Sequence, residues 1–294
     1  MSLAARPQSS AREAARVVRH FIARRGVEVC ALQASPLLGA VLGGADLGAD
    51  DARRMVLLLV GSVALTAHVF VFNDWAGYAT DARDLRRAGL GGISRRQVGS
   101  LAGALLVVAT VALAPLGTAA LAYGAGIALL SVVYSCSPAF GKGTPVAASL
   151  NHLTGGVLHF LLGYALFHTV DGRGVGLGLF FGLVFAAGHL NQEVRDHDAD
   201  RRNGIRTIAV AFGCRRGFLA SFALFTAAYL LVAGLAAAGE LPELLLVGLA
   251  AWALQAWWTR QALRRGLGFE TALWMQRRYR LLFAAIGLAM LVTS

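Results

Sequence analysis

Nine hydrophobic runs follow one another along the chain, separated by segments that are rich in polar and charged residues. A helix that crosses a bilayer needs about 20 predominantly apolar residues, and each run is close to that length. The pattern therefore predicts an all-α fold, a polytopic membrane protein built as a bundle of nine transmembrane helices. The predicted spans are 28–46, 54–73, 97–114, 117–137, 145–167, 174–192, 216–237, 242–259 and 278–293.

The composition agrees with a membrane protein. Hydrophobic residues make up 57% of the 294 residues and charged residues only 15%, whereas soluble domains carry about 25% charged residues. The net charge of +11 would suggest nucleic acid in a soluble protein. Here the arginines gather between the hydrophobic runs, where membrane topology explains them, so no nucleic-acid partner is expected. The three cysteines show no metal-binding spacing and indicate no disulfide framework.

Basic residues are concentrated in the N-terminal segment and in the segments after the even-numbered runs. The positive-inside rule places the N-terminus and these segments in the cytoplasm, in a protein of the plasma membrane. Residues 1–26 are predicted as a basic interfacial segment, because an apolar helical stripe that includes Val17 and Phe21 lies among arginines. Residues 27–294 are predicted as one transmembrane domain surrounded by membrane lipids.

Two of the cytoplasmic segments carry clustered carboxylates. Asp196 and Asp200 are four residues apart and would share one face of a helix. Carboxylates this close repel one another unless a cation lies between them, and Mg²⁺, with a substrate phosphate as its usual companion, is the natural candidate. The alternative is a solvated charged loop. The acidic residues are Asp74, Asp81 and Asp84 in segment 73–94, and Glu193, Asp196, Asp198 and Asp200 in segment 191–206.

Carboxylates at one face of an apolar bundle favour a substrate with two unlike parts. Mg²⁺ that bridges carboxylates to phosphate oxygens, with arginine and lysine neutralising the remaining charge, would make a diphosphate site. The apolar bundle below that site can hold a long hydrocarbon tail. The pattern therefore indicates a diphosphate with an isoprenoid tail, whose allylic carbon–oxygen bond ionises as the metals withdraw charge.

Three motifs resemble those of a known family. Residues 193–210, EVRDHDADRRNGIRTIAV, match the pattern DxxDxxxDRxxGxxTLPV almost position by position, with Glu193 for the first Asp. Residues 73–81, NDWAGYATD, and 86–94, RRAGLGGIS, resemble NDxxDxxxD and RPxxxGxIS, and 134–142, YSCSPAFGK, resembles YSxxPxxxK. The chain thus resembles the UbiA superfamily of intramembrane prenyltransferases, which has nine transmembrane helices and two aspartate-rich motifs.

The resemblance implies a set of site residues. The implied metal ligands are Asn73, Asp74 and Asp81 in one cluster and Glu193, Asp196 and Asp200 in the other. The residues implied to be catalytic are Asn73, Asp81, Asp196 and Asp200. The residues expected to bind substrate are Arg86, Lys142, Arg201 and Arg206, which would contact diphosphate, and Asn151. Two departures, Gly77 for an aspartate and Arg87 for a proline, put the first metal site in question.

Polar residues inside the fifth predicted span are candidates for an acceptor pocket, because polar groups in a span are costly and often functional. These are Asn151, His152 and His159, and the alternative is interhelical hydrogen bonding.

The function that the resemblance implies is Mg²⁺-dependent transfer of a prenyl group. The donor would be an allylic polyprenyl diphosphate, the acceptor an aromatic or other small molecule, and diphosphate would be released. The superfamily also contains terpene cyclases that use no external acceptor, and the altered first motif keeps that alternative open. A transporter is a third reading, although polar groups on one side only disfavour it, since a transporter binds near the bilayer midplane.

Overall fold

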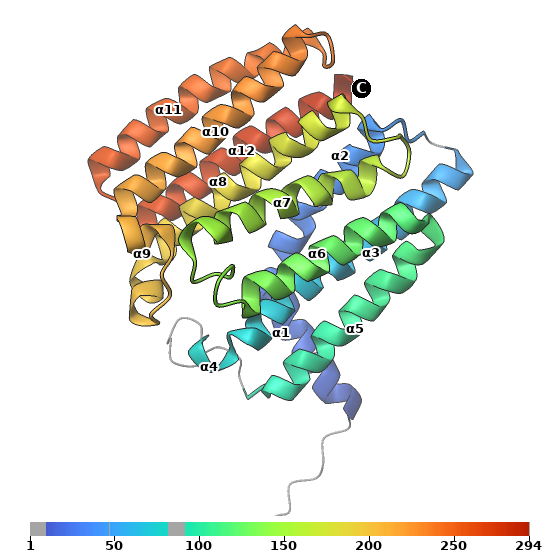
Figure 1. The fold of residues 1–294 in the computed structure, drawn as a ribbon, viewed down its shortest axis with the longest axis vertical. Coiled ribbons are helices and arrows are strands. Elements are labelled where there is room, and N and C mark those ends of the chain that lie inside the picture. The colour runs from blue at the N-terminus through green and yellow to red at the C-terminus, as the bar shows by residue number, and fades with distance from the viewer. Residues whose placement is uncertain (1–9, 47, 82–91, 294) are drawn as a thin grey trace, which may run out of the picture.

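The protein is described by a computed structural model that covers residues 10–46, 48–81 and 92–293. Within these ranges the chain is helical and contains no strand. Figure 1 shows α8, α10, α11 and α12 on one side of the bundle, α3, α5 and α6 on the other, and α2 and α7 between them. The elements are α1 (Ser10–Leu32), α2 (Ala34–Leu42), α3 (Ala49–Ala76), α4 (Tyr78–Asp81), α5 (Arg95–Leu113), η1 (Ala114–Leu116), α6 (Thr118–Cys136), α7 (Pro145–Tyr164), α8 (Gly172–Arg202), α9 (Ile208–Phe212), α10 (Cys214–Ala237), η2 (Glu243–Val247), α11 (Gly248–Arg265) and α12 (Phe269–Thr293).

Helices overlap all nine predicted spans, so the all-α prediction is confirmed over the described residues. Five helices of the described part are long and apolar enough to cross a membrane, namely α3, α5 with η1, α6, α8 and α10. The full count of nine spans stays a prediction. Of the other long helices, α1, α7 and α12 contribute polar side chains to the lining of an internal cavity.

The first predicted span, 28–46, is covered by parts of two helices and not by a single one. Helix α1 begins at Ser10 and continues to Leu32, and a turn at Gln33 separates it from α2. Val17 of α1 is buried in a cluster with Val71 of α3 and Val98 of α5, so α1 packs on the bundle well before residue 27. The helix passes through the predicted boundary at residue 26 without a break, and a separate interfacial segment therefore stays a prediction.

Local sequence signals explain where the helices begin and end. Ser94 and Gln97 form a capping box at the start of α5, in which each side chain satisfies a backbone N–H of the first turn. Asp171 accepts a hydrogen bond from the Gly174 N–H at 2.7 Å and caps α8. Gly117, with φ of 101°, lies in the short turn between α5 and α6, where its backbone conformation favours glycine.

Helices α7 and α8 approach each other so closely that only glycine fits at their contact. A Cβ atom built on Gly156 of α7 would lie 2.7 Å from the Cα atom of Gly182 in α8 and 2.9 Å from the carbonyl oxygen of Phe181. Small residues allow such close helix packing in membranes, where dispersion contacts replace the hydrophobic effect. This contact fixes the relative position of two helices that both line the cavity described next.

Candidate active site

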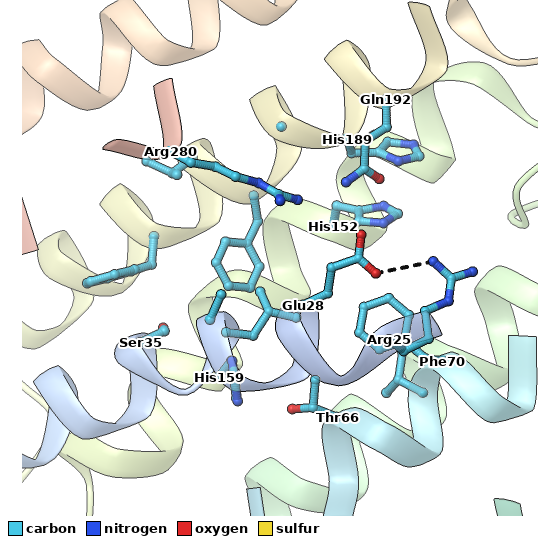
Figure 2. Close-up of a pocket in the computed structure, with 18 of the residues that line it drawn as sticks. Arg25, Glu28, Ser35, Thr66, Phe70, His152, His159, His189, Gln192 and Arg280 are labelled. Carbon is cyan, nitrogen blue, oxygen red and sulfur yellow. Dashed lines mark hydrogen bonds and ion pairs between the residues drawn. The ribbon is translucent and has the colours of Figure 1, made fainter. Parts of the chain in front are cut away.

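A cavity of about 1430 Å³ opens between α1, α2, α3, α6, α7, α8 and α12. Its mouth is polar and its deeper walls are apolar, with Phe181, Phe185 and Phe283 among the residues that line it. Figure 2 shows Arg25 and Glu28 of α1 paired beside His152 and His189, with Arg280 of α12 projecting from another wall. The cavity can therefore hold a ligand that has one charged end and one apolar end.

The first acidic motif contributes the end of α3 to the mouth. Asn73 and Asp74 both line the cavity. The Asn73 amide Nδ2 donates a hydrogen bond to the Ser135 hydroxyl at 3.2 Å, and Asp74 Oδ1 lies 3.5 Å from a guanidinium nitrogen of Arg25. Asp81 ends α4, and its side chain, together with all of Arg86, lies outside the described part of the chain.

The second motif lies on α8, which runs through Arg202, so its carboxylates are on a helix and not in a loop. Asp196 and Asp200 both line the cavity, as their i,i+4 spacing predicted. Asp200 is only 6% exposed. Asp196 is held by Arg195 through two contacts of 3.0 and 2.8 Å, and Arg195 also donates to the Gln276 side-chain oxygen at 3.0 Å.

Glu193 also lines the cavity, and one of its two oxygens is hydrogen-bonded. Oε2 accepts a hydrogen bond from the Ile208 N–H at 2.9 Å, which ties α8 to the start of α9. Oε1 faces Nε2 of His189 at 3.0 Å, and neither atom has an aligned hydrogen-bond partner. Glu193 therefore has a structural role here, and its role as a metal ligand stays a prediction.

Of the predicted diphosphate-binding cations, Lys142 lines the cavity mouth. Arg201 and Arg206 are exposed and do not line the cavity, whereas Arg202 does. The reason is helical rotation. Arg202 follows the cavity-lining Asp198 by four residues and shares its face, while Arg201 is turned away by about 100°.

The predicted acceptor-pocket residues of α7 line the cavity as well. The Asn151 amide donates to the Leu130 carbonyl at 2.9 Å, and the His159 ring lies 2.8 Å from the Ser62 hydroxyl. The rings of His152 and His189 are stacked, with centroids 3.7 Å apart and planes 9° from parallel. These contacts confirm interhelical hydrogen bonding for Asn151 and His159, on residues that also face the cavity.

Several charged residues of the cavity were missed by the sequence reasoning. Arg25, Glu28, Arg195 and Arg280 all line it. Arg280 carried a readable signal, because a charge within a predicted span, here 278–293, marks a functional position by default. The signal for Arg25 and Glu28 was weaker. Their i,i+3 spacing allows an ion pair on one face of a helix, and in the structure their side chains form one at 3.3 Å.

The donor chemistry of the mouth suits a divalent metal held jointly with substrate. Among the described residues no group of three or more His, Cys, Asp or Glu side chains is placed to hold a metal ion by itself. Mg²⁺ does not require such a cage, since proteins usually bind it through one or two carboxylates together with substrate phosphates and water. Asn73, Asp74 and Asp200 supply oxygen ligands of that kind at the cavity wall.

Fold and cavity together define a helical integral membrane protein with an internal site for an amphipathic ligand. The chain belongs to the UbiA prenyltransferase family, whose family model matches residues 34–291. The resemblance read from the three motifs is thereby confirmed. Comparison with curated protein sequences finds no match.

Solved structures confirm the fold. A UbiA homologue from Archaeoglobus fulgidus bound to GPP and Mg²⁺ is 20% identical, with a TM-score of 0.70 over 95% of this chain and 99% of that one. A digeranylgeranylglyceryl phosphate synthase is 16% identical, with a TM-score of 0.71 over 95% and 98%. The apo UbiA homologue from Aeropyrum pernix K1 is 19% identical, with a TM-score of 0.67 over 90% and 98%.

Proposed function

We propose that this protein is a Mg²⁺-dependent intramembrane prenyltransferase. It moves a prenyl group from an allylic polyprenyl diphosphate to an aromatic or other small acceptor and releases diphosphate. The observation that carries the proposal is that residues of both acidic motifs and Lys142 line one cavity whose deeper walls are apolar. Structures of an Archaeoglobus fulgidus homologue, bound to Mg²⁺ with GPP or with DMAPP, support the same class of substrate.

The polar residues at the mouth of the cavity would bind the diphosphate end of the substrate. Asn73, Asp74 and Asp200 would hold Mg²⁺, which when bound withdraws charge from the leaving diphosphate. Lys142 and Arg202 neutralise the remaining phosphate charge.

The aromatic walls serve the other end of the substrate. The rings of Phe181, Phe185 and Phe283 pack against the prenyl chain and keep water from the reacting carbon. Their faces also stabilise positive charge that develops there.

The site also fits a position at a membrane surface. The arginines in the last turns of α8 and α11 support a cytoplasmic mouth in the plasma membrane, by the positive-inside rule. The basic face of α1 suits contact with anionic lipids at the same surface.

The size of the cavity favours a transferase over a cyclase. Sites for one small ligand occupy about 300–1,000 Å³, and this cavity of about 1430 Å³ is larger. The surplus room suits a second substrate beside the prenyl diphosphate. A terpene cyclase, which captures the cation with its own substrate's double bonds, needs no such room.

The test is diphosphate release by the purified protein with Mg²⁺ and geranylgeranyl diphosphate, with and without a pool of acceptors. We expect release that depends on acceptor and Mg²⁺ and falls at least about 100-fold in Asp200→Asn. Asp50→Asn is the matched control, because it removes the same charge from a side chain that is 73% exposed and does not line the cavity. A cyclised product formed without acceptor would establish the cyclase instead, and no release under any condition would refute both.

A further inference from the structure

A second hollow lies outside the cavity, between the start of α10 and the end of α11. It has a volume of about 460 Å³ and is lined by Cys214, Arg215, Arg260, Leu263, Arg264 and Leu267. Three of these six residues are arginines and none is acidic. In Figure 1 this corner adjoins α9 and the turn between α11 and α12, at the end of the bundle where α8 ends.

The three arginines of the hollow are exposed, and none makes a hydrogen bond or an ion pair with another described residue. Their neighbours differ in this respect. The guanidinium carbons of Arg265 and Arg278 both lie over the Trp274 ring, 4.5 and 3.9 Å from its centroid. Cation–π contacts with Trp274 thus stabilise the guanidinium groups of these two neighbours. The three arginines of the hollow have no such partner among the described residues.

The floor of the hollow is apolar and firmly packed. Leu263 and Leu267 belong to a hydrophobic cluster with Val194 of α8, Phe218 of α10 and Met275 of α12. An apolar floor beneath three guanidinium groups matches a molecule with a phosphate and an adjoining hydrocarbon part. Basic pockets between membrane helices recognise anionic lipid headgroups in this way, because guanidinium binds phosphate oxygens in a bidentate manner.

We propose that this hollow is a binding site for one anionic phospholipid, whose phosphate is held by Arg215, Arg260 and Arg264 and whose glycerol and first acyl carbons lie on Leu263 and Leu267. Charge complementarity selects the occupant, since a zwitterionic lipid brings a cation into the same ring of arginines. The lipid bridges α10 and α11 and leaves the catalytic cavity free. The site is independent of the proposed reaction, because no residue that lines it lines the cavity.

The test measures binding of phosphatidylglycerol and of phosphatidylcholine with the same acyl chains to the delipidated full-length protein in a neutral detergent, by native mass spectrometry. The variant is Arg260→Gln/Arg264→Gln. The matched control is Arg216→Gln/Arg277→Gln, which removes the same charge from exposed arginines outside the hollow. We expect the variant to bind phosphatidylglycerol at least about tenfold more weakly and the control to bind it as the parent does.

Three outcomes would overturn the proposal. Equal weakening in both double variants would show attraction by overall charge, and equal binding of the two lipids by the parent protein would remove the anionic preference. Competition by inorganic phosphate at the affinity of the lipid would identify a free anion as the ligand. Arg260→Lys/Arg264→Lys separates folding from charge, because it keeps both charges and should retain the preference for phosphatidylglycerol.

Discussion

The close contact of α7 and α8 makes a sharp prediction for Gly156→Ala. The new Cβ would lie 2.7 Å from the Gly182 Cα atom, whereas carbon atoms in contact are normally about 3.5–4.0 Å apart. Both obstructing atoms are backbone, so the helices must separate by about 1 Å. Overpacking of this kind costs about 1–3 kcal/mol, and the better helix propensity of alanine returns about 1 kcal/mol of it.

The expected net loss for Gly156→Ala is about 0–2 kcal/mol, which lowers the unfolding temperature by up to roughly 8 °C. The measurement is thermal unfolding in detergent, with Gly155→Ala as the control. Gly155 is on the same helix, and a Cβ there meets nothing within 4 Å, so the control should unfold at or above the parent's temperature.

Activity gives a second readout of the same change. His152 and His189 come from the two separated helices, and a displacement of about 1 Å near reacting groups can cost on the order of 100-fold in rate. Equal unfolding temperatures and equal activities for Gly156→Ala and Gly155→Ala would refute the close approach of α7 and α8.

Three further changes test other contacts. Arg195→Gln removes the two charge-assisted contacts to Asp196 and should destabilise the fold by about 1.5–3 kcal/mol, measured by thermal unfolding. Ser62→Ala deprives the buried His159 ring of its partner at 2.8 Å and should cost about 1–3 kcal/mol in the same assay. A backbone N–H that donates to Asp171 lowers the pKa of this carboxyl. The ionised Asp171 carboxylate therefore stabilises the fold above its unfolded-state pKa, and this stabilisation is lost as the pH falls through the lower folded-state pKa. The difference in unfolding temperature between the parent and Asp171→Ala should accordingly shrink below about pH 4.

The second motif was the most predictable part of the site. Its carboxylates follow an apolar run directly, so the helix continues into the motif and i,i+4 spacing places Asp196 and Asp200 on one wall of the cavity. Which arginine faces inward was not predictable in the same way. It depends on the rotation of α8 about its axis, and one residue of rotation exchanges Arg201 for Arg202.

The first helix shows what hydropathy alone does not predict. Hydropathy identifies residues that contact lipid, but Arg25 and Glu28 of α1 face the cavity and lie in a helix that begins at Ser10. Their positions depend on contacts with residues far along the chain, such as the 3.5 Å approach of Arg25 to Asp74. Spacing within a segment predicts which residues share a face, whereas the packing of distant helices decides what that face meets.

The two walls of the mouth share one electrostatic arrangement. On α3, Asp74 is approached by Arg25, and on α8, Asp196 is held by Arg195. Both arginines line the cavity, so the guanidinium groups that neutralise these carboxylates also face the space where we propose that diphosphate binds. If Mg²⁺ and a diphosphate were bound here, Asp74 would be available to hold the metal, and Arg25 and Arg195 would be available to neutralise phosphate charge. With Gly77 in place of a carboxylate, the α3 wall has one negative charge fewer to neutralise, and Arg25 divides its contacts between Asp74 and Glu28 of its own helix.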